Sequence, residues 1–230
     1  NAITANTAKV TNSTSATDLT SGTLADARFP ATLPAVDGSL LTGISSGGAS
    51  DINGLTDGYN VGNSVGLGTD ALANDDGTYN RNTAVGSNAL TTNTTGPYNT
   101  AIGWSALKLN TTGTANTATG YGTLINNTTG GYNTANGLMS SFANTTGGHN
   151  TASGTYALKF NTTGGYNTAN GDTALHSNTT ASYNTASGAY ALRLNTTGTK
   201  NVGLGYGAGD AITTGSNNTI IGDYAGTTTL

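Results

Sequence analysis

The sequence predicts an all-β chain that folds as a parallel β-roll solenoid with 17-residue coils. Two short phrases recur at that period and in phase with each other, Asn-Thr-Thr and Asn-Thr-Ala-x-Gly. The first phrase begins at Asn93, Asn110, Asn127, Asn144, Asn161, Asn178 and Asn195. The glycine of the second recurs as Gly86, Gly103, Gly120, Gly137, Gly154, Gly171, Gly188, Gly205 and Gly222. A fixed period without insertions is typical of stacked repeats, since a globular core does not require one residue type at one interval.

The composition favours an ordered repeat array and excludes several classes of protein. Only 8% of the 230 residues are charged and the formal net charge is -4, whereas disordered chains usually combine high net charge with irregular spacing. The seven Lys and Arg residues are scattered, so we expect no nucleic-acid partner. The absence of cysteine excludes a disulfide framework and a thiolate metal site.

Three regions are expected along the chain. Residues 1–56 are rich in Ser, Thr and Ala and lack the repeat, so they are predicted to form an extended stalk or linker. Residues 57–226 are predicted to be the β-roll repeat domain, and residues 227–230 to begin a further C-terminal region. No apolar run reaches the length of a signal sequence or membrane span, so we expect no membrane insertion by this segment.

Each coil is predicted to hold two short strands separated by corners that contain Gly and Asn. Helices are not expected, because Thr and Asn are weak helix formers and Gly interrupts each segment. Along the first strand, alternation places Asn99 and Ala101 on one face and Thr100 and Ile102 on the other. The recurring glycine is predicted to mark a corner or bulge, and the Asn and Thr side chains to form hydrogen-bonding ladders from coil to coil.

Two columns of apolar residues are predicted to be buried. One column is nearly constant Ala, namely Ala84, Ala101, Ala118, Ala135, Ala152, Ala169 and Ala186. The other is a Leu ladder, namely Leu90, Leu107, Leu124, Leu158, Leu175 and Leu192, which is broken at Ser141 between Met139 and Phe142. A buried Leu contributes roughly 2 to 3 kcal/mol, against about 1 to 2 kcal/mol for ordering the backbone of each residue. Because one stack is this thin, three chains are predicted to associate as a homotrimeric fibre.

The repeat phrases resemble those of known fibre families. Ser64–Gly68 and Asn99–Gly103 are similar to the Asn-Ser-Val-Ala-Ile-Gly repeats of trimeric autotransporter adhesin heads, which implies a parallel β-roll trimer. The longer phrase Asn-Thr-Thr-Gly-x-Tyr-Asn-Thr-Ala-x-Gly more closely resembles repeats of bacteriophage tail fibres and related bacterial trimeric fibre proteins. Residues 22–30 and 37–44 are also similar to linker phrases of phage tail fibres.

Departures from the adhesin pattern decide between these families. The coil is longer than the adhesin unit, and nothing in the sequence resembles the coiled-coil stalk and membrane anchor of an autotransporter. The resemblance therefore favours a phage-type or phage-derived fibre. It implies an extracellular location on a virion or bacterial cell surface.

One aromatic column is the candidate contact surface. Its members are Tyr98, Tyr132, His149, Tyr166 and Tyr183, which are predicted to stack along one edge of the fibre. A Tyr ring combines an apolar face with a polar tip, which suits contact with a cell-surface glycan or protein receptor. Ala115 and Lys200 occupy the same column, so a structural role as a shield for the strand corners stays open.

No catalytic, cofactor-binding or metal-binding residue is predicted. Glycines in residues 66–71 and 203–208 fit a loose dinucleotide fingerprint, but the repeat accounts for them. Asp172 and Asp223 share a column three coils apart, roughly 14 Å at about 4.8 Å per coil, beyond the ~5 to 9.5 Å between paired carboxylates in glycosidases. Asp75 and Asp76 are expected in a solvated turn, and His176 on the surface.

These features predict a structural and adhesive fibre segment without enzymatic activity. It would project a receptor-binding tip and gain strength from three copies of a weak site. Two alternatives stay open. An ice-binding solenoid would present a flat Thr ladder, although Lys108, Lys159 and Arg193 share a column that would interrupt such a plane. A glycan-cleaving tail spike would need a carboxylate pair built across chains.

Overall fold

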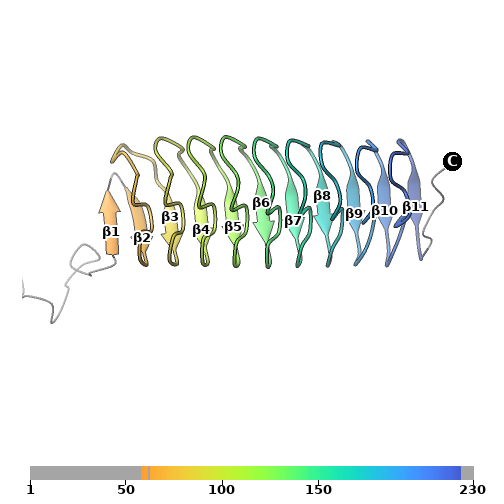
Figure 1. Cartoon of the computed structure of the whole chain (residues 1–230), viewed down its shortest axis with the longest axis horizontal. Coiled ribbons are helices and arrows are strands. Elements are labelled where there is room, and N and C mark those ends of the chain that lie inside the picture. The colour runs from red at the N-terminus through yellow and green to blue at the C-terminus, as the bar shows by residue number, and fades with distance from the viewer. Residues whose placement is uncertain (1–57, 62, 224–230) are drawn as a thin grey trace, which may run out of the picture. The chain divides into compact units, whose positions relative to one another are not determined.

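One short strand forms in each coil where the repeat reads Thr-Ala-x, and the strands lie side by side in a long row (Figure 1). The computed structural model describes residues 58–61 and 63–223, so the predicted stalk at residues 1–56 and the C-terminal region at 227–230 lie outside the described residues. The strands are β1 (Gly58–Val61), β2 (Ser64–Leu67), β3 (Thr83–Val85), β4 (Thr100–Ile102), β5 (Thr117–Thr119), β6 (Thr134–Asn136), β7 (Thr151–Ser153), β8 (Thr168–Asn170), β9 (Thr185–Ser187), β10 (Val202–Leu204) and β11 (Thr219–Ile221). The predicted all-β solenoid with 17-residue coils is confirmed.

The sheet follows the order of the sequence. Strands β2 to β11 pair in parallel, each with the next, and β1 pairs with β2 in the antiparallel direction. The register advances by one repeat, so that Ala101 lies opposite Ala118, while the β2–β3 step pairs Val65 with Thr83 and absorbs one extra residue. Equivalent residues of successive coils are therefore direct neighbours, which turns each sequence column into a physical ladder.

The prediction of two strands per coil is wrong. The segment that follows each strand is a run of turns, because two of its residues adopt the left-handed conformation that a strand excludes. In the β4 coil these residues are Ser105 and Leu107, with φ of 54° and 51°. Their columns keep positive φ in coil after coil, and this backbone bends the chain around its own interior.

The apolar interior contains the two predicted ladders and a third. The Ala column of the strands and the Leu column are buried as expected, with Ala101 and Leu107 fully inaccessible. Ser141, which breaks the Leu ladder, is also buried. A second small-residue column lies beside the Leu ladder, namely Ala71, Ala89, Ala106, Thr123, Ser140, Ala157, Ala174, Ala191 and Ala208. The strand alternation is confirmed too, since Asn99 is buried while Thr100 and Ile102 point outwards.

Two asparagine ladders fill the rest of the interior. The strand Asn ladder precedes the strands, namely Asn82, Asn99, Asn116, Asn133, Asn150, Asn167, Asn184, Asn201 and Asn218. In it the Asn99 side-chain oxygen accepts the Asn116 backbone N–H at 2.9 Å, and the Asn99 amide donates to the Gly113 carbonyl at 2.8 Å. The turn Asn ladder begins each Asn-Thr-Thr phrase, and in it Asn110 donates to Asn93 at 2.8 Å. Predicted coil-to-coil ladders are thereby confirmed.

Each strand ends at the recurring glycine, as predicted for a corner. Gly137 has φ of 129°, which side chains rarely tolerate, and a Cβ there would lie 2.7 Å from the Gly154 carbonyl carbon and oxygen. Successive corners are therefore in backbone contact. This close approach explains why the glycine column does not vary in the described coils.

The asparagine ladders change the argument for a trimer. The predicted association rested on a core of one Leu and one Ala per coil, whereas the interior also holds a second small residue and two hydrogen-bonded Asn side chains. Buried amides with full hydrogen bonding do not carry the desolvation cost of unpaired polar groups. The interior of one chain is thus already filled, and a trimer must be argued from the outer surface.

Candidate functional site

The five predicted contact residues lie together at the corner that precedes the strands. We call Tyr98, Tyr132, His149, Tyr166 and Tyr183 the tyrosine ridge. Its Tyr members are 54 to 58% exposed. The rings of Tyr132, His149, Tyr166 and Tyr183 form one continuous stack, with successive centroids 4.9, 4.6 and 5.2 Å apart and planes within 7° of parallel. The predicted stacking is therefore confirmed for four of the five residues.

Tyr98 lies apart from this stack, because Ala115 occupies the intervening coil. It has a cation as neighbour instead. The Arg81 guanidinium donates to the Tyr98 hydroxyl at 2.8 Å, and its central carbon lies 5.5 Å from the ring centroid. The ridge therefore ends in a charged group on this side.

Stacking limits what the ridge offers to a ligand. In the continuous stack each inner ring has both faces covered by its neighbours, so ring edges and hydroxyl groups remain accessible. The residues of the ridge also adopt left-handed backbone, with φ of 60° at Tyr132 and 64° at Tyr183. That conformation costs about 1 to 2 kcal/mol per residue, which is comparable to the 0.5 to 1.5 kcal/mol of an aromatic pair. The ridge therefore contributes little net stability.

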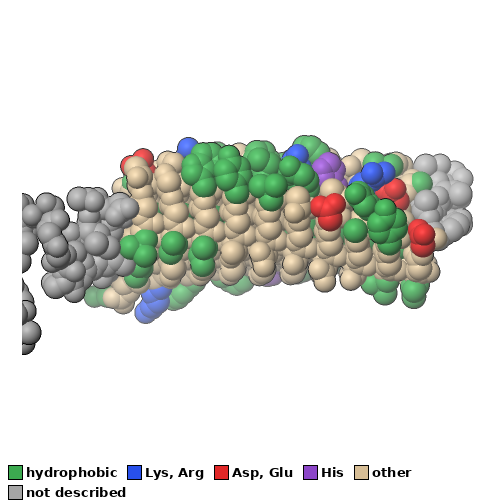
Figure 2. Space-filling view, turned by 90° about the horizontal axis from the view of Figure 1, so that it is seen from below, with side chains coloured by type: hydrophobic (Ala, Val, Ile, Leu, Met, Phe, Trp, Pro, Cys, Tyr) green, Lys and Arg blue, Asp and Glu red, His purple; other side chains and the backbone are tan. Residues whose placement is uncertain are grey.

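Exposed large apolar side chains also follow the strands, in two separate columns. Trp104, Tyr121 and Leu138 come directly after the recurring glycine that ends each strand, and we call them the apolar edge; their exposure runs from 40 to 47%. Leu109, Phe160 and Leu194, which are 39 to 44% exposed, form another column at the end of the turn segment, directly before the Asn-Thr-Thr phrase. Trp104 and Tyr121 stack with centroids 4.6 Å apart. In Figure 2 the largest group of hydrophobic side chains lies along the upper edge over the middle coils, and smaller groups lie lower in the view toward both ends of the solenoid. The sequence does not predict this surface, because only the coil geometry shows that these columns face solvent.

Charged side chains lie in the turn segment that follows the strands. Lys159 packs against two aromatic rings, 4.4 Å from the Tyr156 centroid and 5.2 Å from that of Phe160. Burial lowers the pKa of His176, and the nearby cations Lys159 and Arg193 lower it further. The column that was expected to interrupt a Thr plane thus belongs to the turn segment and not to the strand face.

The outward face of the strands carries no charged side chain in β3 to β11. Its first column is Thr83, Thr100, Thr117, Thr134, Thr151, Thr168, Thr185, Val202 and Thr219. Its second column is Val85, Ile102, Thr119, Asn136, Ser153, Asn170, Ser187, Leu204 and Ile221. The strands are regular and in register, so this strand face is a flat array of small side chains in its middle coils.

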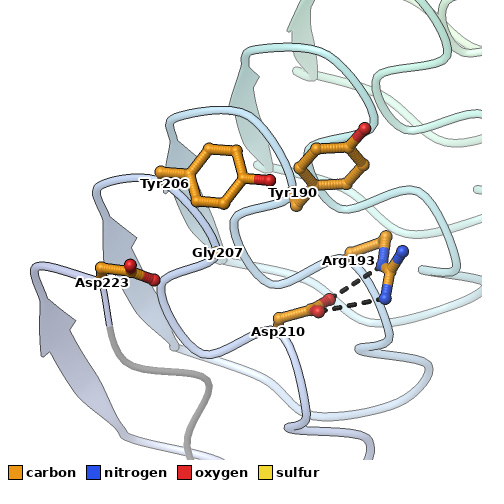
Figure 3. Close-up of a pocket in the computed structure, with 6 residues that line it drawn as sticks. All are labelled: Tyr190, Arg193, Tyr206, Gly207, Asp210 and Asp223. Atoms are coloured by element: carbon orange, nitrogen blue, oxygen red, sulfur yellow. Dashed lines mark hydrogen bonds and ion pairs between the residues drawn. The ribbon is translucent and has the colours of Figure 1, made fainter.

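A shallow pocket of about 360 Å³ opens near the C-terminal end of the described coils (Figure 3). It is lined by Tyr190, Arg193, Tyr206, Gly207, Asp210 and Asp223. Arg193 and Asp210 form a two-pronged ion pair, with Nε to Oδ1 at 2.9 Å and the second nitrogen to Oδ2 at 3.0 Å. The sequence contained a signal for this pair, since the two residues are one period apart. Asp223 lines the same pocket as Asp210, although the two residues belong to different columns and the sequence therefore does not predict that they share a site.

The acidic turn at the N-terminal end is hydrogen-bonded within itself. Asp75 is buried, contrary to the expected solvated position, because it accepts hydrogen bonds from Gly77 and from the side chains of Asn80 and Asn82. Asp76 is exposed, and its hydrogen bonds from Thr78, led by the backbone N–H, lower its pKa. In residues 58–61 and 63–223 no three His, Asp or Glu side chains are grouped to hold a metal ion.

Comparison of the chain with known protein families, curated proteins and solved structures gives no match. The described coils also include no helix with the length and hydropathy needed to cross a membrane. Four surfaces of the described coils are therefore candidates for contact with a partner: the tyrosine ridge, the apolar edge, the strand face and the pocket.

Proposed function

We propose that this chain is a structural and adhesive segment of an extracellular fibre, carried on a virion or bacterial cell surface and without catalytic activity. The observation that carries the proposal is the unbroken register of the parallel sheet from β2 to β11. Both asparagine ladders tie each coil to the next through buried hydrogen bonds. Bending or stretching the array would break these bonds, so ten coils at about 4.8 Å each form a stiff rod suited to projecting a receptor-binding tip.

The apolar edge supports a homotrimer. Exposed patches rich in aromatic and large aliphatic side chains mark protein interfaces, and the apolar edge places Trp104, Tyr121 and Leu138 side by side in three successive coils. The tyrosine ridge lies before each strand and the apolar edge after it, so packing three copies through the apolar edge leaves the ridge accessible. Three ridges on one rod then multiply weak individual affinities.

Light scattering tests the trimer directly. We expect the purified chain to be a trimer at micromolar concentration, and a double variant Trp104→Lys, Tyr121→Lys to be a monomer. Tyr132→Lys on the tyrosine ridge is the matched control, since it adds a charge at an exposed Tyr outside the proposed contact, and it should remain trimeric. A monomeric unmodified chain would refute the assembly.

Cell binding tests the adhesive role. Fluorescently labelled chain is applied to a panel of bacterial strains that differ in surface polysaccharide, and bound chain is measured by flow cytometry. We expect the triple variant Tyr132→Ala, Tyr166→Ala, Tyr183→Ala to keep its melting temperature within a few degrees and to lose binding. Undiminished binding by the triple variant would show that the ridge is a spacer surface. No binding to any strain by the unmodified chain would contradict an adhesive role for this segment.

The strand face supports ice binding as a second candidate function. The face is flat, its middle coils carry Thr, Ser and Asn, and the charged column lies elsewhere. Ice-recrystallisation inhibition by the purified chain measures this activity. If ice binding is the function, Thr151→Lys should abolish the inhibition, whereas Thr146→Lys, at an exposed Thr of the turn outside the strand face, should not. The fibre proposal predicts no inhibition by any of the three proteins.

A further inference from the structure

The pocket lies where one coil has Gly at a position that carries a larger side chain in the three preceding coils. Gly207 belongs to a column that carries Tyr156, Thr173 and Tyr190 in preceding coils. All of these residues share the left-handed backbone, with φ of 63° at Gly207 and 62° at Tyr190. A Cβ at Gly207 would lie 3.6 Å from the Asp223 Oδ1 atom, so the hollow is bounded by this carboxylate. A missing Tyr-sized side chain thus leaves a space with a polar wall.

The polar groups around this space are held in place. Arg193 uses two of its five N–H groups on Asp210, and its guanidinium lies 5.4 Å from the Tyr190 ring centroid. The remaining N–H groups and the two carboxylates of Asp210 and Asp223 border the same hollow (Figure 3). A donor-rich cation beside carboxylate acceptors matches a ligand whose hydroxyl groups both donate and accept.

Tyr206 supplies the apolar wall. Tyr206 is the more exposed of the two pocket tyrosines, at 64%. Its ring meets the Tyr190 ring edge-on, with centroids 5.5 Å apart and an angle of 76° between the ring planes. Because Tyr190 covers the guanidinium with its own face, Tyr206 is the ring whose face is left for a ligand. A Tyr face packs well against C–H groups, while its hydroxyl remains in water.

We propose that this pocket binds one pyranose unit of a neutral saccharide. The C–H face of the sugar would lie on Tyr206, with vicinal hydroxyls bridging Arg193 and the carboxylates of Asp210 and Asp223. A volume of about 360 Å³ is at the small end of ligand pockets, which suits one ring. Two carboxylates against one guanidinium disfavour an anionic sugar. The biological meaning of this site rests on the proposed attachment function, although binding itself does not.

Titration of the full chain with methyl pyranosides tests the proposal. Methyl glucoside, galactoside and mannoside are added separately to ¹⁵N-labelled chain, and amide shifts are followed by NMR. We expect at least one of them to shift the amides of Tyr206, Gly207 and Asp210 with a dissociation constant in the millimolar range. Methyl glucuronide, which adds a carboxylate, should bind more weakly than methyl glucoside. No shift with any of the three neutral sugars at tens of millimolar would overturn the proposal, as would tighter binding of the glucuronide.

Three variants test whether the sugar binds in this pocket. Gly207→Tyr restores the side chain of its column and should remove the shifts, while Gly122→Tyr makes the same change in the same column five coils away and should bind normally. Asp223→Asn should weaken binding roughly tenfold. Unchanged affinity in both Gly207→Tyr and Asp223→Asn would refute the site. Cell attachment that persists when Gly207→Tyr blocks sugar binding would leave the fibre proposal intact and confine the pocket to a minor role.

Discussion

Removing one rung of the turn Asn ladder should destabilise the chain far more than its small change in volume suggests. Asn144 is buried and makes three side-chain hydrogen bonds. Its amide donates to the Asn127 side chain at 2.8 Å and to the Gly147 carbonyl at 2.9 Å, and its oxygen accepts from Asn161 at 2.9 Å. Asn144→Ala removes all three bonds in the middle of the array.

The size of the stability loss depends on which hydrogen bonds the partners of Asn144 keep in the variant. Gly147 still accepts from Asn133, and Asn161 still donates to Gly164, whereas the Asn127 oxygen loses the only side-chain donor found for it among the described residues. Each of the three lost bonds costs about 0.5 to 1.5 kcal/mol and the buried unpaired oxygen costs about 1 to 3 kcal/mol, which together give about 2.5 to 7.5 kcal/mol. That is a large share of the about 5 to 15 kcal/mol by which folded domains are stable.

Urea unfolding followed by circular dichroism measures this loss. Thr146→Ala is the control, because Thr146 is exposed two residues away in the same coil and should change stability by less than about 0.5 kcal/mol. The loss of stability in Asn195→Ala should lie between the losses in Asn144→Ala and Thr146→Ala. The reason is that the Asn195 side-chain oxygen accepts only one long hydrogen bond, at 3.4 Å from the Asn201 amide. Equal stability of Asn144→Ala and Thr146→Ala would show that the Asn ladder does not hold the coils together.

Three further experiments test the Leu ladder, the glycine corner and the pKa of His176. Leu158→Asp places a charge in the buried Leu ladder and should lower the melting temperature severely, while Lys159→Asp loses only the cation–aromatic contacts and should lower it slightly; similar shifts would mean that the turn segment is assigned wrongly. Gly137→Ala should destabilise because its Cβ meets the next coil's backbone at 2.7 Å, and an unchanged melting temperature would contradict that close contact. The lowered pKa of His176 means that the folded chain binds fewer protons than the unfolded chain as the pH falls through its ordinary value of 6.5. The melting temperature should therefore decrease from about pH 7.5 to pH 5, and His176→Phe should reduce that slope; an equal slope in the variant would refute it.

The repeat period alone determined most of the fold. Parallel pairing in register places residues 17 apart side by side, so a constant Ala or Leu column had to be interior and a constant Gly had to be a corner. The same logic predicted that the aromatic residues of the tyrosine ridge would stack, as Tyr132, His149, Tyr166 and Tyr183 do. Periodicity identifies neighbours between coils, and these conclusions require nothing else.

The path of the chain within one coil was decided only by the tertiary structure. Ser105 and Leu107 adopt left-handed backbone, a conformation that Ser and Leu rarely adopt and that the sequence therefore does not predict. For this reason the second strand predicted from the sequence is a run of turns. That bend buries the Asn side chains, separates the apolar edge from the tyrosine ridge, and brings Asp210 and Asp223 to the hollow left by Gly207. The physical reason is that a column fixes the distance along the array, whereas the direction of each side chain depends on φ and ψ around the coil and on packing across its interior.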